Sequence, residues 1–237
     1  MARTQKIDNA LQKRFSYTNN KKGKNREVRI YFLIVCEGAK TEPNYFKSFP
    51  KQIGKIVYDI ELEGGGLNTL RVVEKAIELR DKSTQKYDRV WAVFDRDSFP
   101  ARDFNNAIQK AKANNISCAW SNEAFELWYL LHFHNRVTPM SRDEYKKSIE
   151  KSVNDQIKDK KKAFNYAKNA PDMYLILEKY GSQEQAIRWA KELTQKFNDE
   201  KFAHHNPCTH VFKLVEELIG KSDTLNQEIA EKLQTGD

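Results

Sequence analysis

VRIYFLIVCEG, residues 28–38, is the stretch that decides the fold. Its run of aliphatic and aromatic residues predicts a buried strand, and Glu37 and Gly38 follow it directly. A second run, Val90–Phe94, leads in the same way into Asp95-Arg96-Asp97. In a parallel sheet, ligand-binding and catalytic groups collect beyond the carboxyl ends of the strands. If these two strands are neighbours, three carboxylates meet at one edge of the sheet, and such hard oxygen ligands suit Mg²⁺ or Mn²⁺.

Strand and helix patterns alternate through the first half of the chain, which predicts an α/β fold with a parallel sheet and helices on both faces. We expect one helix to start at Thr41-Glu42-Pro43 with Thr41 as its cap, and another to be capped by Asn68. The expected strands are 28–36, 56–62, 89–94 and 116–120, and a third helix spans 101–114.

Helical patterns dominate beyond residue 120. They cover 122–133, 141–151, 160–169, 172–180, 183–198 and 207–220. The tail after Lys221 is polar, so fraying is expected there. This pattern divides the chain into a basic N-terminal arm (1–27), an α/β domain (28–135) and a helical region (136–237) packed on or beside it.

Composition favours a polyanionic partner, but only moderately. The 237 residues include 41 Lys and Arg against 33 Asp and Glu, a formal charge of +8. Basic residues crowd the N-terminal arm, and a second cluster contains Lys158, Lys160, Lys161 and Lys162. A solvated charge run explains these clusters as well as direct nucleic-acid contact does.

The cysteines and the hydropathy pattern favour a soluble cytoplasmic protein. Cys36, Cys118 and Cys208 are widely spaced, and free thiols fit a reducing cytosol. No apolar stretch has the length of a membrane span, and no apolar signal core lies at the N-terminus. We therefore expect no membrane association.

Each acidic candidate also has a structural interpretation. Asp95 and Asp97 can be turn formers, and Glu37 can stabilise the next helix N-terminus electrostatically. Glu42, in the first turn of that helix, fits the structural role better, so we rank Glu37 above it for chemistry. Glu126 lies in a segment that is apolar nearly all round. A buried carboxylate there needs a partner, and an arginine is nearly as good a candidate as a metal ion.

Other polar groups carry weaker signals. Glu123 shares a helix face with Glu126 but suits a helix N-terminus, and His132 and His134 can cap carbonyls. His204, His205, Cys208 and His210 match no standard zinc spacing, and the proline at 207 indicates a helix start. The glycines at 64–66 lack the ending of a phosphate-binding Walker loop.

Taken together, four motifs resemble the RloB family of prokaryotic defence proteins, which have a Toprim-type catalytic domain. The motifs are Cys36-Glu37-Gly38 with Thr41, Glu42 and Tyr45; Asp95-Arg96-Asp97; Ser121–Trp128 continuing through Leu131-His132-Phe133; and Asn206-Pro207-Cys208-Thr209 with Val211. They span most of the chain, from about Val28 to Leu218, and are specific only in combination.

The resemblance implies a Toprim fold whose acids bind Mg²⁺ for phosphodiester chemistry. Glu37 would then be a metal ligand or general acid/base, and Asp95 and Asp97 would be metal ligands. Related nucleases often have another acid four positions after the glutamate, where this chain has Thr41. That departure makes Glu126 our candidate for a second metal site. The family also implies abortive infection with an ABC/SMC-like ATPase partner, and this chain has no nucleotide-binding motif of its own.

Three functions remain open at this point. The first is a metal-dependent endonuclease acting on DNA or RNA, tRNA included. The second is a non-catalytic subunit that binds nucleic acid or a partner and keeps a vestigial metal site. The third is other phosphoryl chemistry such as strand transfer, which needs a nucleophilic tyrosine that the sequence does not single out.

Overall fold

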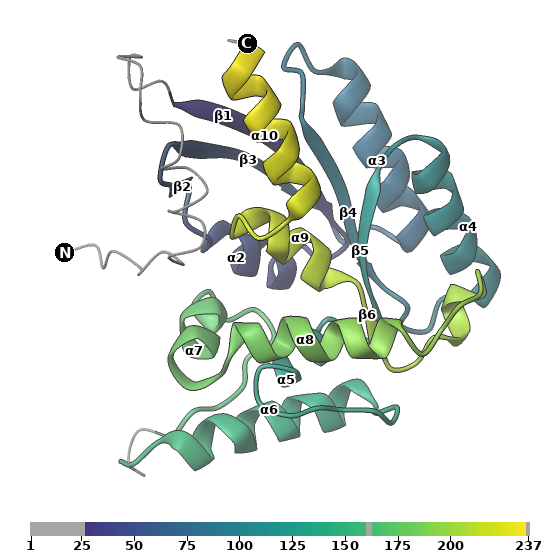
Figure 1. Ribbon diagram of the computed structural model, residues 1–237. Coiled ribbons are helices and arrows are strands. Elements are labelled where there is room, and N and C mark those ends of the chain that lie inside the picture. The colour runs from purple at the N-terminus through teal and green to yellow at the C-terminus, as the bar shows by residue number, and fades with distance from the viewer. Residues whose placement is uncertain (1–26, 160–162, 236–237) are drawn as a thin grey trace.

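The computed structural model describes residues 27–159 and 163–235, and in this part of the chain the central element is a six-stranded sheet (Figure 1). Its strands lie in the order β2-β3-β1-β4-β5-β6. They are β1 (Val28–Cys36), β2 (Gln52–Ile53), β3 (Ile56–Gly64), β4 (Arg89–Asp95), β5 (Ser117–Asn122) and β6 (Cys208–Thr209). The inner four are parallel, and the short edge strands β2 and β6 are antiparallel. The predicted α/β class is confirmed, with a mixed rather than wholly parallel sheet.

β1 contributes to both apolar cores because successive side chains on a strand point to opposite faces. Phe32, Ile34 and Cys36 belong to one core, and Leu33 and Val35 belong to the other; all five are fully buried. Burial on both faces explains why this stretch is apolar without alternation.

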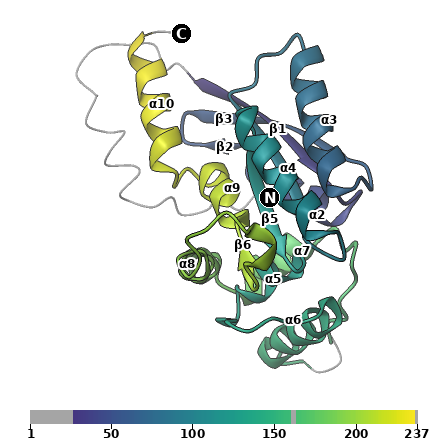
Figure 2. The same ribbon diagram turned by 90° about the vertical axis from the view of Figure 1, so that its right-hand side faces the viewer.

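One face of the sheet is covered by α3 (Thr69–Lys82) and α4 (Ala101–Ala113). α3 begins as predicted, because the Asn68 side chain accepts a hydrogen bond of 3.0 Å from the backbone N–H of Arg71. Figure 2 shows α3 and α4 on one side of the sheet and α9 (Val211–Leu218) and α10 (Asp223–Thr235) on the other.

The second face carries the larger core. Tyr45 and Phe46 of α2 (Thr41–Lys47) and the apolar residues of α5 (Glu126–Leu130) pack there with α9 and α10. Three further helices pack around α2 and α5: α6 (Arg142–Gln156), α7 (Met173–Tyr180) and α8 (Gln183–Thr194). In Figure 1 they lie below the sheet, and β6 carries the chain back to its edge.

Three expected helix starts are wrong. Lys40, not Thr41, is the N-cap of α2, because the Thr41 hydroxyl instead donates to the carbonyl oxygen of Lys168 at 2.7 Å. The helix expected over 122–133 is only α5, since Ser121 and Asn122 still pair with β6. The helix expected from Pro207 begins only at Val211 as α9, because Cys208 and Thr209 pair with β5 as strand β6. In all three places a tertiary contact takes a group that the local pattern assigned to the helix.

Two further expectations change in the helical region. Residues 163–169 form no helix, and residues 160–162 lie outside the described residues. The tail expected to fray is instead α10, whose Leu225 and Ile229 are buried in the larger core. Its apolar positions are few, but they fall on one face and meet the sheet.

Much of the basic sequence lies outside the described residues. The expected N-terminal arm lies outside the described residues up to residue 26, as do Lys160, Lys161 and Lys162. The three cysteines are free, with Cys36 and Cys208 buried and Cys118 partly buried. Among residues 27–159 and 163–235, no helix has both the length and the apolar character needed to cross a membrane.

Candidate active site at the carboxyl ends of β1 and β4

Glu37 leaves β1 at the point where β1 borders β4. Its backbone N–H donates to the Val93 carbonyl at 2.8 Å, and its Oε2 accepts the backbone N–H of Asp95 at 3.0 Å. Burial raises the pKa of Glu37 to about 7, and the charges of Glu42 and Asp97 add to this rise while the Asp95 N–H and Arg142 oppose it. The carboxyl ends of β1 and β4 therefore lie side by side, as expected.

Asp95 and Asp97 differ in exposure although they are two positions apart. Asp95, the last residue of β4, has only 6% of its surface exposed, and burial raises its pKa well above the ordinary value. Asp97 is partly exposed and has a positive φ of 41°, which aspartate tolerates better than most residues. Its N–H donates to the Glu123 carbonyl at 3.0 Å, so the turn is tied to the segment after β5.

Glu126 joins these acids from the first turn of α5. It is 2% exposed, and its Oε1 accepts a hydrogen bond of 3.2 Å from the Tyr166 hydroxyl. Burial and the nearby charge of Glu126 raise the pKa of Tyr166, so this hydroxyl stays protonated and remains a donor. A carboxylate so deeply buried requires such partners.

Glu42 also belongs to the site. It is 6% exposed, and burial, followed by the charge of Glu126, raises its pKa, while Lys168 and Arg142 oppose the rise. A Cβ at Gly38 would lie 2.1 Å from Glu42 Oε2, so the missing side chain at Gly38 leaves room for this carboxylate. Our ranking of Glu42 as a structural acid therefore understated its place beside Glu37.

We use the term acidic cluster for Glu37, Glu42, Asp95, Asp97 and Glu126. Its members come from the residue after β1, from α2, β4 and the turn after β4, and from α5. Asp95 Oδ1 and Glu42 Oε2 are buried without a hydrogen-bond partner among the described residues. Buried oxygens of this kind are costly unless a proton or a cation compensates for them.

Arg142 is the cation that lies among these acids. It is the first residue of α6, which starts at Ser141 with reciprocal hydrogen bonds between Ser141 and Glu144. Its Nη2 lies 3.1 Å from Asp95 Oδ2, its Nη1 lies 3.1 Å from Asp97 Oδ2, and its Nε lies 3.6 Å from Glu126 Oε2. Glu126 thus pairs with an arginine, as the alternative interpretation of the sequence expected, and the same arginine also pairs with Asp95 and Asp97.

The composition of the acidic cluster fits a divalent cation. Carboxylate oxygens are the ligands preferred by Mg²⁺ and Mn²⁺, and two of the buried oxygens lack partners. As they stand, no three His, Cys, Asp or Glu side chains of the described residues are placed to hold an ion together. Arg142 lies between Asp95, Asp97 and Glu126, so binding of an ion there requires these side chains to rearrange.

The histidines lie elsewhere and have their own packing contacts. His132 Nδ1 lies 3.0 Å from the Trp128 carbonyl, and His134 Nε2 lies 2.9 Å from Ser152 Oγ. His205 pairs with Asp199 at 2.8 Å, and His210 stacks on a tryptophan ring. These contacts account for the positions of these four histidines without a ligand.

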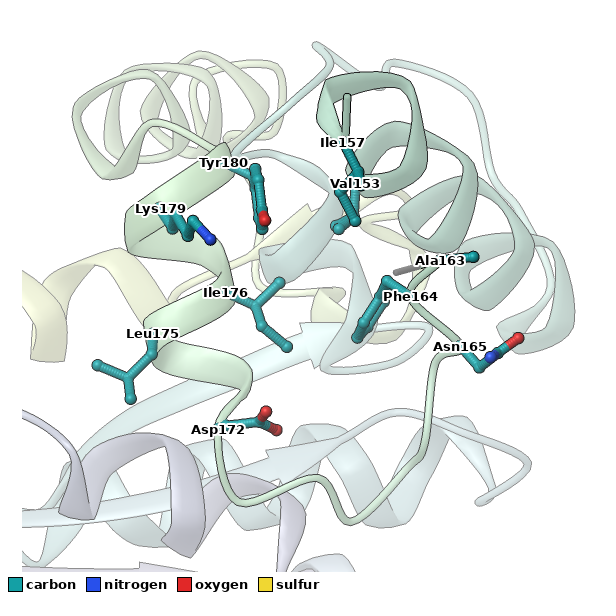
Figure 3. A pocket seen from close by; sticks show the side chains of 10 residues that line it. All are labelled: Val153, Ile157, Ala163, Phe164, Asn165, Asp172, Leu175, Ile176, Lys179 and Tyr180. Atoms are coloured by element: carbon teal, nitrogen blue, oxygen red, sulfur yellow. The ribbon is translucent and has the colours of Figure 1, made fainter. Parts of the chain in front are cut away.

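A hollow of about 520 Å³ between α6 and α7 contains none of the acidic cluster (Figure 3). Its walls include Val153, Phe164 and Ile176, with Asp172 and Lys179 at its sides. It lacks a set of converging acids, so we place the chemistry at the acidic cluster rather than in this hollow.

Sequence reasoning missed Arg142 and Tyr166. Arg142 stands beside a capping motif, Ser141 with Glu144, that explains the local order without any catalytic role. Tyr166 falls in a segment interpreted as helical. Neither position carries a signal that links it to a strand end more than forty residues away.

Comparison with known proteins provides one match. Neither the curated proteins nor the solved structures return a match to this chain. A family model described as RloB-like protein matches residues 32–218, which include the whole acidic cluster and Arg142. Since this match covers most of the 237 residues, the resemblance noted in the sequence is confirmed, and the chain belongs to the RloB family.

Proposed function

We propose that this chain is a metal-dependent endonuclease that cleaves phosphodiester bonds with Toprim-type chemistry. The observation that carries the proposal is the convergence of five carboxylates at one edge of the sheet, three of which pair with Arg142. Two of their buried oxygens have no partner among the described residues. Such a site is better suited to a divalent cation than to packing.

Asp95, Asp97 and Glu126 are the residues that would hold the ion. A bound Mg²⁺ or Mn²⁺ would polarise the scissile phosphate and stabilise the leaving oxygen. Glu37 serves as a further ligand or as the general acid/base. Its Oε2 is occupied by the Asp95 N–H, which leaves Oε1 to take a proton from the attacking water. A pKa of about 7 suits such a transfer near neutral pH.

The substrate and setting follow from charge and family. A formal charge of +8 favours a nucleic acid, either DNA or RNA, with tRNA included. Family membership supports a role in antiphage defence as a cytoplasmic protein, with an ABC/SMC-like ATPase partner. That partner would supply the nucleotide-binding function for which this sequence has no motif.

A non-catalytic subunit that binds nucleic acid or a partner is the second candidate. The observation that favours it is Arg142, which already pairs with three of the acids that an ion would need. In that case the acidic cluster would be a vestigial metal site in which Arg142 stays paired with the acids and no metal ion binds.

Incubation of the purified protein with Mg²⁺ or Mn²⁺ and either tRNA or plasmid DNA tests the proposal. We expect cleavage by the wild-type chain and none by Asp95→Ala. Asp103→Asn is the matched control, because Asp103 is a partly exposed acid in the first turn of α4 whose ion pair is with the adjacent Arg102. Absence of cleavage of either substrate, even with the ATPase present, would favour the non-catalytic subunit.

A further inference from the structure

Arg142 is attached to the acidic cluster through an incomplete set of contacts. Its two Nη atoms each reach a different aspartate at 3.1 Å, rather than forming two parallel hydrogen bonds with one carboxylate. Its Nε faces Glu126 at 3.6 Å, too far for a hydrogen bond, and is buried without a hydrogen-bond partner among the described residues. The guanidinium therefore pairs with three acids without the geometry that gives arginine its strongest pairing.

The acids around Arg142 are likewise unsatisfied. Asp95 and Glu42 are each 6% exposed, and each has a buried oxygen with no partner among the described residues. One guanidinium thus serves a cluster whose charge it does not balance. An ion of charge two that accepts several oxygens at once would satisfy this cluster better.

Arg142 can also leave its position. Its side chain is 24% exposed, so it reaches solvent from the site. It is the first residue of α6, and the capping bonds between Ser141 and Glu144 hold the helix start independently of the Arg142 side chain. Rotation of this one side chain would vacate the space among the acids without unwinding the helix.

We propose that Arg142 is an internal counter-ion that holds the cation position of the acidic cluster and is displaced when a divalent cation binds. This inference rests on the metal site of the proposed function and adds a regulatory step to it. Binding of the metal ion then becomes an exchange of one cation for another, and it releases the Arg142 guanidinium from the acids toward solvent. Arg142 is in this sense a positioning residue whose contacts in the ion-free state set the affinity for metal.

Calorimetric titration of Mn²⁺ without nucleic acid tests the exchange. Arg142→Gln should bind Mn²⁺ about tenfold more tightly than wild type, because no side chain competes for the acids. Arg136→Gln removes the same charge from the loop before α6, where the Arg136 Nε donates to the Thr138 carbonyl, and should leave the affinity unchanged. Adding Asp97→Asn to Arg142→Gln should reverse the gain.

Arg142→Lys keeps the charge and guards against a variant that fails to fold. One ammonium cannot contact three acids as the guanidinium does, so Arg142→Lys should bind Mn²⁺ more tightly than wild type, though less tightly than Arg142→Gln. In EDTA, the melting temperature of both variants should lie below that of wild type. Addition of Mn²⁺ should raise the melting temperature of the variants by more than it raises that of wild type. Unchanged or weaker Mn²⁺ binding in a folded Arg142→Lys or Arg142→Gln protein overturns the proposal.

These outcomes are separable from those of the nuclease assay. Tighter Mn²⁺ binding by Arg142→Gln with no cleavage of any substrate supports the counter-ion and contradicts the nuclease. Cleavage that requires Asp95, with no gain in affinity from Arg142→Gln, supports the nuclease and overturns the counter-ion. No Mn²⁺ binding to any variant also overturns the counter-ion, since nothing would then compete with Arg142.

Discussion

Two arginines of this protein meet buried acids, and they do so in opposite ways. At the far edge of the larger core, Glu217 of α9 accepts from Arg89 Nε at 3.0 Å and from Trp91 Nε1 at 2.8 Å, and Arg89 also pairs with Glu228 at 2.8 Å. Both Glu217 oxygens are therefore satisfied. At the acidic cluster, Arg142 is shared among three acids, and two buried oxygens remain without partners in the described part of the chain.

The comparison separates a structural ion pair from a site arranged for a ligand. The Arg89–Glu217 pair ties α9 to the start of β4, and together with Trp91 it gives each carboxylate oxygen of Glu217 a hydrogen-bond donor. The acidic cluster gathers like charges at the other end of β4, where they raise one another's pKa values. Proteins accept such electrostatic cost mainly where function requires it.

The largest expected effect is that of Glu37→Gln on catalysis. Removal of the acid/base should lower turnover by about 10²–10⁴-fold, while the melting temperature stays equal or rises because like charges are relieved. Cleavage kinetics at saturating Mg²⁺, paired with calorimetry, measure both quantities. If Glu37→Gln unfolds instead, Glu37 belongs with Glu217 among the structural acids.

Glu217→Ala should have the opposite signature. Loss of this buried partner leaves Arg89 and Trp91 incompletely bonded and should cost about 2–3 kcal/mol of unfolding free energy. Turnover of the folded protein should not change. Urea denaturation measures the loss. Glu216→Ala is the control, since the partly buried Glu216 pairs with an exposed lysine, Lys191, and the loss of this pair should cost about 1 kcal/mol or less.

Glu126→Gln falls between these two cases. The amide can still accept from Tyr166, so we expect little change in stability and a loss of about 10–100-fold in metal affinity or turnover. Glu123→Gln is the matched control, because Glu123 is partly exposed and precedes α5, so it does not share a helix face with Glu126 as the sequence pattern predicted. A loss of stability with intact activity would place Glu126 in an ion pair alone.

The smallest effect is the pH dependence of stability at Glu37. Its folded pKa of about 7 lies above the unfolded value of about 4.5, so between these values the native state binds more protons than the unfolded state. Stability from this group therefore rises as pH falls from 7 to 4.5. Glu37→Gln should exceed wild type by about 1 kcal/mol above pH 7, after allowance for partial exposure, and lose this advantage by pH 4.5.

The difference in stability between wild type and Glu37→Gln separates the contribution of Glu37 from that of buried histidines. Burial lowers the pKa of His132 to about 4, so His132 costs stability as pH falls from about 6.5 to 4 in both proteins and cancels in the difference. Urea titrations of both proteins across pH 4.5–8 give the comparison. An advantage of Glu37→Gln that grows toward low pH would contradict the assignment.

The regular elements could be predicted where burial and sequence pattern agree. β1 and β4 were visible because strands buried on both faces are apolar throughout, and Asn68 was visible as a cap because its side chain acts within its own turn. The edge strand β6 was missed because its two residues are defined only by pairing with β5. The prediction of Thr41 as a helix cap was wrong because its hydroxyl donates instead to the carbonyl oxygen of Lys168, which is distant in the chain.

By itself, the sequence determined the α/β class, the family, and the arrival of Glu37, Asp95 and Asp97 at strand ends, since these follow from short-range patterns and the rules of parallel sheets. Only the tertiary structure decided that Glu42 and Glu126 face the same acids and that Arg142 lies among them. Arg142 and Asp95 are 47 positions apart, on elements with independent local signals. Electrostatic pairing across such a distance depends on packing of the helical region against the sheet edge, which no local periodicity encodes.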